Sequence, residues 1–288
     1  MSKSRAKLRA GVIGLGAIGS GVANCLLAAG ADLEVCDVNK DALSEFLTRA
    51  SVAPNPAAMG TTCSIVVVAV VNDDQLKGVL IGPDGYLGSA RPGSTVIILS
   101  TVSVSTIADV AETALGKGVE LIDCGVSGGP HAAKSGSLVA MAGGSVTAIE
   151  SVRPIMECFA DSIIHMGPLG SGIKAKLARN LIQYGSWLAA FEGQKIAQAA
   201  GIELPKLAQA VRESDSKIGG VSTLMFRDTV EPLGDNDDPG LIAAMQSGAG
   251  LARKDLKAVL ELAGELGIDT PLGKLALGQC DAIFGVAG

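Results

Sequence analysis

The stretch Gly14-Leu15-Gly16-Ala17-Ile18-Gly19 decides the fold of the first part of this 288-residue chain. It follows the apolar run Leu8–Ile13 and leads into an Ala-rich segment that ends at Gly30. A second apolar run, Leu33–Cys36, then stops at Asp37. Strand, glycine turn, helix, strand and acid, in this order, are the parts of a dinucleotide-binding unit. We therefore predict a dinucleotide site here.

Each residue type in this unit has a physical reason. Gly14 permits the tight turn, Gly16 lets the backbone approach a pyrophosphate, and Gly19 lets the helix pack closely on the strand. The helix N-terminus stabilises the phosphate charge. Asp37 would accept hydrogen bonds from the ribose hydroxyls and would repel a 2′-phosphate, which favours NAD over NADP. The predicted cofactor-binding residues of the turn are Gly14, Leu15, Gly16, Ala17, Ile18 and Gly19.

A secretory or membrane segment is the alternative for this region. Residues Ala10–Ala31 carry no charge, and they follow four basic residues, Lys3, Arg5, Lys7 and Arg9. However, five glycines are poor filler for an apolar segment, and three of them have phosphate-loop spacing. The dinucleotide site remains the preferred interpretation.

Composition narrows the class of protein further. The formal net charge is −6 and the basic residues form no cluster beyond the N-terminal tail, which argues against a nucleic-acid partner. We also expect no membrane partner, because the longest purely apolar run, Ile65–Val71, is only a strand length. The six cysteines form no CxxC pair, so we predict reduced thiols, no metal site and a cytoplasmic protein. The acidic segment Gly234–Gly240 is interpreted as a solvated loop, with a metal site as the less favoured alternative.

The first part of the chain alternates apolar runs with helical patterns, which predicts an α/β fold of the Rossmann type. Its doubly wound, mostly parallel sheet would carry helices on both faces. The expected strands are Leu8–Ile13, Leu33–Cys36, Ile65–Val70, Thr95–Leu99, Glu120–Asp123, Leu138–Met141 and Ser162–His165. The expected helices are Ile18–Ala29, Lys40–Arg49, Asp74–Leu80 and Val104–Leu115.

After the breaker cluster Gly167–Gly172, the pattern becomes helical. Ile173–Ala200 contains no proline and predicts a helix of about 28 residues, roughly 40 Å long. Such a helix suits the spine of a second, all-α domain. Further helices are expected at Glu203–Ser214, Leu241–Gln246, Leu251–Leu266 and Leu272–Ile283. We predict a NAD-binding domain over residues 1–168 and a helical substrate and dimerisation domain over residues 169–288.

Two segments predict a substrate site. The first, Asp123–Pro130, follows a predicted strand and should lie at the carboxyl end of the sheet. There the Ser127 hydroxyl and the backbone N–H groups of Gly128 and Gly129 could hold a carboxylate; a turn built from small residues is the alternative. In the second, Lys176 and Asn180 stand four apart on one helix face.

Lysine suits proton transfer because burial or a nearby cation lowers its pKa. The residues of this second segment alone also allow the alternative that Lys176 is a surface lysine, whose aliphatic stem covers apolar surface while its amine stays in water.

The motifs in this order resemble the β-hydroxyacid dehydrogenase family, which includes 3-hydroxyisobutyrate dehydrogenase and tartronate semialdehyde reductase. The resemblance covers nearly the whole chain. It is carried by Val12–Gly19, Ser100–Ser103, Ser127–Gly129, Gly136–Leu138, Ala140–Gly144, Gly170 and Gly172 with Lys176 and Asn180, and Lys254–Leu256.

The resemblance implies a role for each matching position. Lys176 would be the catalytic acid and base, and Asn180 would bind and orient the substrate. Ser127, Gly128 and Gly129 would hold its carboxylate. Val71, Asn72 and Thr101 would lie near the nicotinamide half of the cofactor, and Lys254 would reach the cofactor from the helical domain. The family pattern also implies a homodimer or homotetramer assembled through the helical domain.

Several positions depart from the family pattern. Ile18 replaces a methionine, Val71-Asn72 replaces Leu-Pro, and Cys124-Gly125 replaces Ala-Pro. Arg179 replaces the first of two asparagines; it could lower the pKa of Lys176, meet a second anionic group on the substrate, or point into solvent. Gln183 stands where the decarboxylating relatives carry a glutamate, so no enzymatic decarboxylation is expected.

We therefore predict an NAD-dependent oxidoreductase that acts on a small β-hydroxy acid or the matching semialdehyde or β-keto acid. The alternatives are an NADPH-dependent reductase of semialdehydes or imines, and a catalytically silent NAD-binding protein. Lys176 argues against the imine reductases, which usually lack the lysine.

Overall fold

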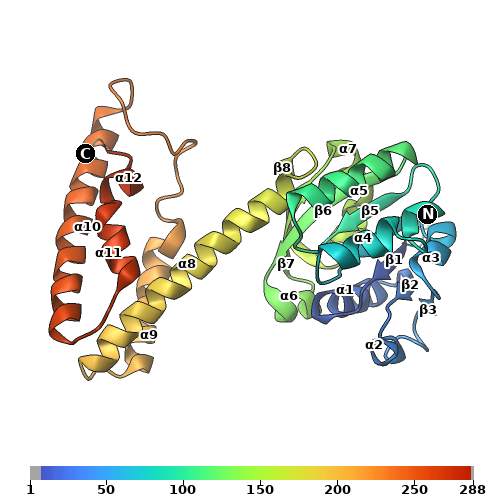
Figure 1. Cartoon of the computed structure of the whole chain (residues 1–288), viewed down its shortest axis with the longest axis horizontal. Coiled ribbons are helices and arrows are strands. Elements are labelled where there is room, and N and C mark those ends of the chain that lie inside the picture. Colours follow the sequence, from blue (N-terminus) through green and yellow to red (C-terminus); the bar gives the residue numbers. More distant parts are fainter. Residues whose placement is uncertain (1–7, 287–288) are drawn as a thin grey trace, which may run out of the picture. The chain divides into compact units, whose positions relative to one another are not determined.

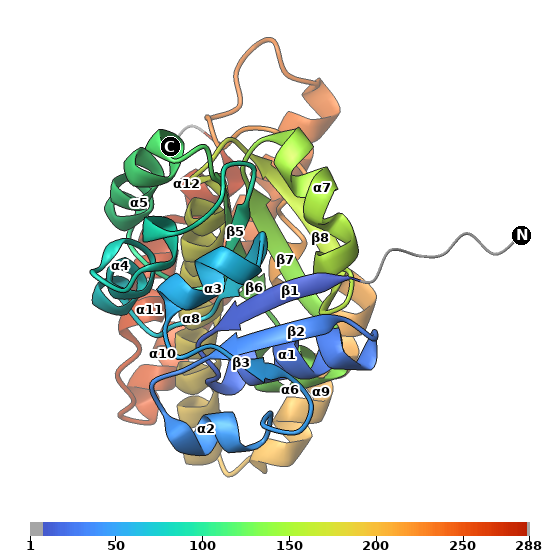
Figure 2. The ribbon, with the colours of Figure 1, turned by 90° about the vertical axis from the view of Figure 1, so that its right-hand side faces the viewer.

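An eight-stranded sheet, in the order β3-β2-β1-β4-β5-β6-β7-β8, organises the first part of the computed structural model, which describes residues 8–286. All neighbouring strands run parallel except β6 and β7. Figure 2 shows β3, β2 and β1 side by side. The strands are β1 (Arg9–Ile13), β2 (Asp32–Cys36), β3 (Ser51–Val52), β4 (Ile65–Val68), β5 (Thr95–Ile98), β6 (Glu120–Ser127), β7 (Leu138–Gly143) and β8 (Ala160–Gly167). The predicted Rossmann-type, mostly parallel sheet is confirmed.

Helices cover both faces of the sheet, because its central strands are apolar on both sides. In β4, for example, Val67 packs into one core while Val66 and Val68 pack into the other. The first core includes α1 (Ala17–Ala28), α6 (Gly129–Ser135) and α7 (Val146–Met156). The second includes α3 (Pro56–Thr62), α4 (Asp73–Ile81), the 3₁₀ turn η1 (Tyr86–Gly88) and α5 (Val104–Gly116). The segment considered as a membrane alternative is β1, the glycine turn and α1; Lys3, Arg5 and Lys7 lie outside the described residues.

The structure corrects several predicted boundaries. β6 continues to Ser127, because Asp123–Ser127 pairs antiparallel with β7. The helix expected over Lys40–Arg49 ends early, as α2 (Lys40–Ser44), and continues as turns. Sequence patterns did not anticipate β3, α3, α6 or α7.

The chain separates into two compact units, Met1–Arg179 and Asn180–Gly288. The separation falls inside α8 (Ser171–Ala199), while the predicted domain boundary after residue 168 lies just before this helix. The first turns of α8 belong to the sheet unit because Ile173 is buried in its second core. The predicted assignment of roles to the two domains stays a prediction.

The second unit is helical (Figure 1). Its further elements are α9 (Leu204–Ile218), the 3₁₀ turn η2 (Gly220–Ser222), α10 (Pro239–Glu265), α11 (Pro271–Gly278) and α12 (Cys280–Phe284). The two helices expected over Leu241–Gln246 and Leu251–Leu266 form one helix, α10. Gly248 does not interrupt it; a Cβ there would lie 2.6 Å from Phe284, so the glycine admits α12. The helix expected over Leu272–Ile283 is instead divided at Gln279.

Asp123 fixes the start of α8 to the sheet. Its carboxylate is buried and accepts hydrogen bonds from the backbone N–H groups of Gly170 and Ile173, each at 2.7 Å. Burial raises the pKa of Asp123, while the backbone donors act in the opposite direction. Two of the N–H groups that a helix leaves without intrahelical partners are thereby satisfied.

We expect Asp123→Ala to destabilise the sheet unit, because it leaves two buried donors without partners. Each such donor costs about 1–3 kcal/mol. The matched control is Ser145→Ala, which removes the exposed cap of α7, where the Ser145 hydroxyl accepts from Ala148 N at 3.0 Å; this costs about 1 kcal/mol. Urea unfolding followed by circular dichroism measures both. A loss for Asp123→Ala no larger than the control's would contradict the account.

Candidate functional site

The glycine turn after β1 has the geometry that its residue types predict. Gly14 has φ +89°, a conformation that side chains other than glycine rarely adopt. A Cβ at Gly19 would overlap the carbonyl oxygen of Gly14 and lie 3.2 Å from Ala69 Cβ. Glycine at 19 therefore lets α1 pack directly against the ends of β1 and β4.

Gly16 is different, because no protein atom requires a glycine there. A Cβ at this position would meet nothing within 4 Å. Gly16 and Ala17 are exposed, and no side chain caps α1. The first N–H groups of α1 are therefore open to an anion, as the predicted pyrophosphate contact requires.

Asp37, at the end of β2, holds the glycine turn. One carboxylate oxygen accepts from Leu15 N at 2.5 Å and the other from Asn39 N at 2.7 Å. Asp37 is half-buried, and each carboxylate oxygen has a further lone pair for a ribose hydroxyl. The adjacent Val38 is fully exposed and offers no charge to a 2′-phosphate.

The loops after β4 and β5 follow neighbouring strands of the sheet. Val71 is 80% exposed, and Thr101 is exposed too. Asn72 is the N-cap of α4, where its side-chain oxygen accepts from Gln75 N at 2.9 Å. The buried Ser100 hydroxyl accepts from Val70 N at 2.9 Å, which joins the two loops. Of the predicted contacts in these loops, Val71 and Thr101 thus present free surface, whereas the Asn72 amide oxygen already has a partner.

The predicted carboxylate site lies at the end of β6, next to β5 in the sheet. Ser127 is half-buried at the last position of the strand, and Gly128 and Gly129 are exposed. Their φ angles, +123° and +70°, turn the chain into α6. A Cβ at Gly128 would overlap that of Ala132, so this turn depends on glycine.

Lys176 lies against β6, two residues from Ser127 along the strand. A Cβ at Gly125 would overlap the Cβ of Lys176 and lie 3.0 Å from its Cγ. Glycine at 125 therefore lets α8 approach the sheet closely at Lys176. Burial lowers the pKa of Lys176, and the nearby Arg179 guanidinium lowers it further. Both effects favour the neutral amine that a general base requires.

Two predicted residues belong to the second unit. Asn180 is half-buried, one turn after Lys176 on α8. Lys254 is exposed on α10, where its amine lies 3.1 Å from the Asp255 carboxylate. Their predicted roles toward substrate and cofactor stay predictions.

Sequence reasoning missed the residues that hold the site in place. Asp123 ended a predicted strand and Gly125 was noted only as a departure from the family pattern. Neither carried a local signal of its contact with α8, because these contacts join positions 47 to 51 residues apart.

Within residues 8–286, no group of three or more His, Cys, Asp and Glu side chains could hold a metal ion. In the same part of the chain, no helix is both long and apolar enough to cross a membrane.

Comparisons with known proteins agree with this geometry. Residues 9–167 match the NAD binding domain of 6-phosphogluconate dehydrogenase. An uncharacterised oxidoreductase of Mycobacterium tuberculosis is 36% identical over 278 residues, which cover 96% of this chain and 94% of the relative. The NAD-dependent L-serine dehydrogenase of Pseudomonas aeruginosa is 30% identical, with 92% and 88% covered.

Among solved structures, an oxidoreductase from Mycobacterium avium has a TM-score of 0.89 at 31% identity, covering 98% of this chain and 100% of that one. An imine reductase from Pseudomonas has a TM-score of 0.74 at 18% identity, with 95% and 92% covered, a likeness of fold alone. The chain belongs to the β-hydroxyacid dehydrogenase family, and its first unit is an NAD-binding domain of the 6-phosphogluconate dehydrogenase type.

Proposed function

We propose that this protein is an NAD-dependent oxidoreductase of small β-hydroxy acids that does not decarboxylate its product. The observation that carries the proposal is the position of Lys176. This lysine packs against β6, the strand that ends at Ser127, because Gly125 has no side chain to keep it away. The relatives point to the same substrate class, since one is named an L-serine dehydrogenase and others L-threonate dehydrogenases.

In the mechanism, bound NAD supplies the acceptor for the hydride that leaves the hydroxyl-bearing carbon. Ser127 and the N–H groups of Gly128 and Gly129 hold the substrate carboxylate, and Asn180 orients the hydroxyl. Neutral Lys176 accepts the hydroxyl proton, and in the reverse direction protonated Lys176 returns it to the carbonyl oxygen. Gln183 is an amide and has no acidic proton to donate, so this position supplies no acid for decarboxylation of the product.

Lys176→Ala should lower turnover by about 10²- to 10⁴-fold, the usual contribution of a positioned acid or base. NADH binding, measured by fluorescence titration, should change little. Turnover is measured as NADH absorbance with a panel of 3-hydroxyisobutyrate, serine, threonate and glycerate. If the variant loses NADH binding and turnover together, Lys176 is structural. If the wild-type protein oxidises no acid but reduces imines with NADPH, the alternative holds.

Arg179→Asn is the companion variant, because it keeps the Lys176 amine and removes the neighbouring cation. Oxidation requires neutral Lys176, so its rate should rise with pH through the pKa of this lysine. Without Arg179 the charged form is less disfavoured, the pKa moves up, and this limb of the profile should shift to higher pH. A limb that stays in place would mean that Arg179 does not lower the pKa of Lys176, and a rate that does not rise with pH would remove Lys176 from the role of base.

We further propose a cytoplasmic homodimer or homotetramer, assembled through the helical unit. Large apolar side chains are exposed on this unit, and an oligomer would bury them. They are Leu181, Tyr184, Trp187, Leu188 and Phe191 on α8, Ile218 at the end of α9, and Val221, Met225, Phe226 and Val230 beyond α9. All six cysteines are free thiols, which is the usual state in a reducing compartment.

Trp187 reports on this assembly, because it is the only tryptophan and is 59% exposed in the single chain. In the oligomer its emission should be blue-shifted and protected from iodide. Leu181→Asp should give a monomer by light scattering, with red-shifted, quenchable emission. The control Leu47→Asp places the same charge on an exposed leucine of the sheet unit and should leave the oligomer intact. A wild-type monomer would contradict the proposal.

A further inference from the structure

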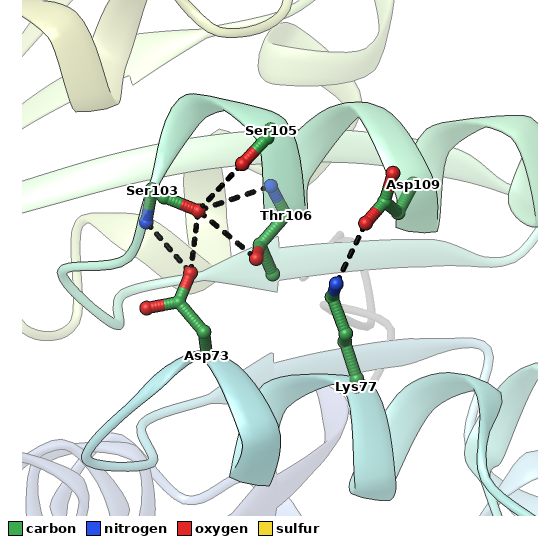
Figure 3. Close-up of polar contacts among 6 residues, drawn as sticks. All are labelled: Asp73, Lys77, Ser103, Ser105, Thr106 and Asp109. Atoms are coloured by element: carbon green, nitrogen blue, oxygen red, sulfur yellow. Dashed lines mark hydrogen bonds and ion pairs between the residues drawn. The ribbon is translucent and has the colours of Figure 1, made fainter.

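Asp73 and Ser103 join the loops that follow β4 and β5. Asp73 is the first residue of α4, and Ser103 is the N-cap of α5. The backbone N–H and the hydroxyl of Ser103 both donate to one carboxylate oxygen of Asp73, at 2.9 and 2.6 Å (Figure 3). One carboxylate oxygen therefore receives two hydrogen bonds from the other loop.

The Ser103 hydroxyl is itself held in place. It accepts from Thr106 N at 3.2 Å and lies 3.0 Å from the Thr106 hydroxyl, which is buried. The hydrogen bond that the Ser103 hydroxyl donates to Asp73 is the largest of the effects that lower the pKa of this carboxyl to about 2. The carboxylate is therefore charged, and accepts both bonds, at any pH near neutrality.

The hydrogen bonds from Ser103 to Asp73 form one tie between the two loops. A second tie lies nearer the strand ends, where Val70 N donates to the Ser100 hydroxyl. The two ties enclose a short piece of each loop, Val71-Asn72 on one side and Thr101-Val102 on the other. Between the ties, Val71 and Thr101 are exposed. They are the positions for which the family resemblance implies contact with the nicotinamide half of the cofactor.

Packing of α4 against α5 does not depend on the Asp73 tie. Leu76 and Leu80 of α4 are fully buried in the same core as Ile107 and Val110 of α5. Further along, Lys77 and Asp109 form an ion pair at 2.7 Å between the same two helices (Figure 3). The structure thus contains a matched pair of exposed polar links, one at the loops and one away from them.

We propose that Asp73 is a positioning residue for the nicotinamide half of NAD, which holds the loops after β4 and β5 at the spacing that receives the ring. This inference rests on the proposed function and deepens it. It predicts that loss of Asp73 weakens the binding of NADH but not the binding of ADP-ribose. ADP-ribose contains the adenosine and pyrophosphate parts of the cofactor but no nicotinamide.

The experiment measures the affinity of the full chain for NADH and for ADP-ribose by calorimetry. Asp73→Ala removes both hydrogen bonds from Ser103 and should weaken NADH binding about tenfold, while ADP-ribose binding stays nearly unchanged. Asp73→Asn keeps an acceptor oxygen and should recover most of the NADH affinity, which also guards against misfolding of the alanine variant. The control Lys77→Ala should change neither affinity.

Three results would overturn the proposal. Equal weakening of both ligands by Asp73→Ala would mean a general structural role, and no weakening of NADH would mean no role in binding. An effect of Lys77→Ala as large as that of Asp73→Ala would assign the result to helix packing. The proposed function fails separately, if the wild-type protein binds neither NADH nor ADP-ribose.

Discussion

The hydrogen bonds from the start of α8 to buried Asp123 are the interaction on which the arrangement of the site depends. They place the first turn of a long helix against the middle of β6, and Gly125 removes the side chain that would keep the helix away. Lys176 is brought to the strand by this contact rather than by any bond of its own amine. The same close packing desolvates the amine and lowers its pKa, so one contact affects both the position and the pKa of Lys176.

Other carboxylates hold the loops along the rest of the sheet edge in the same way. Asp37 fixes the glycine turn after β1, and Asp73 fixes the loops after β4 and β5. In each case the acid accepts a hydrogen bond from one backbone N–H group of a neighbouring loop, a strong, directional contact. The edge is thereby pre-organised, while Gly16, Ala17, Val71 and Thr101 stay exposed for a ligand.

Local patterns in the sequence predict the sheet well, because fully buried strands such as Ile65–Val68 appear as short apolar runs. The glycine turn is also predictable, since Gly14 and Gly19 are required by backbone conformation and close packing, while Gly16 leaves room for a ligand. Asp123, Gly125 and Asp73 escape prediction because their partners lie far along the chain. The break expected between Leu241–Gln246 and Leu251–Leu266 is absent, because Gly248 lies within α10 and makes room for Phe284 of α12.

We propose that one edge of the sheet binds NAD with its reactive ring toward Lys176. A crystal structure of the chain with NAD tests this most directly. We expect the pyrophosphate at the N–H groups of Gly16 and Ala17, the adenosine ribose at Asp37, and the nicotinamide beside Thr101 on the side of Lys176. A nucleotide bound away from the glycine turn, or a ring turned from the lysine, would contradict it.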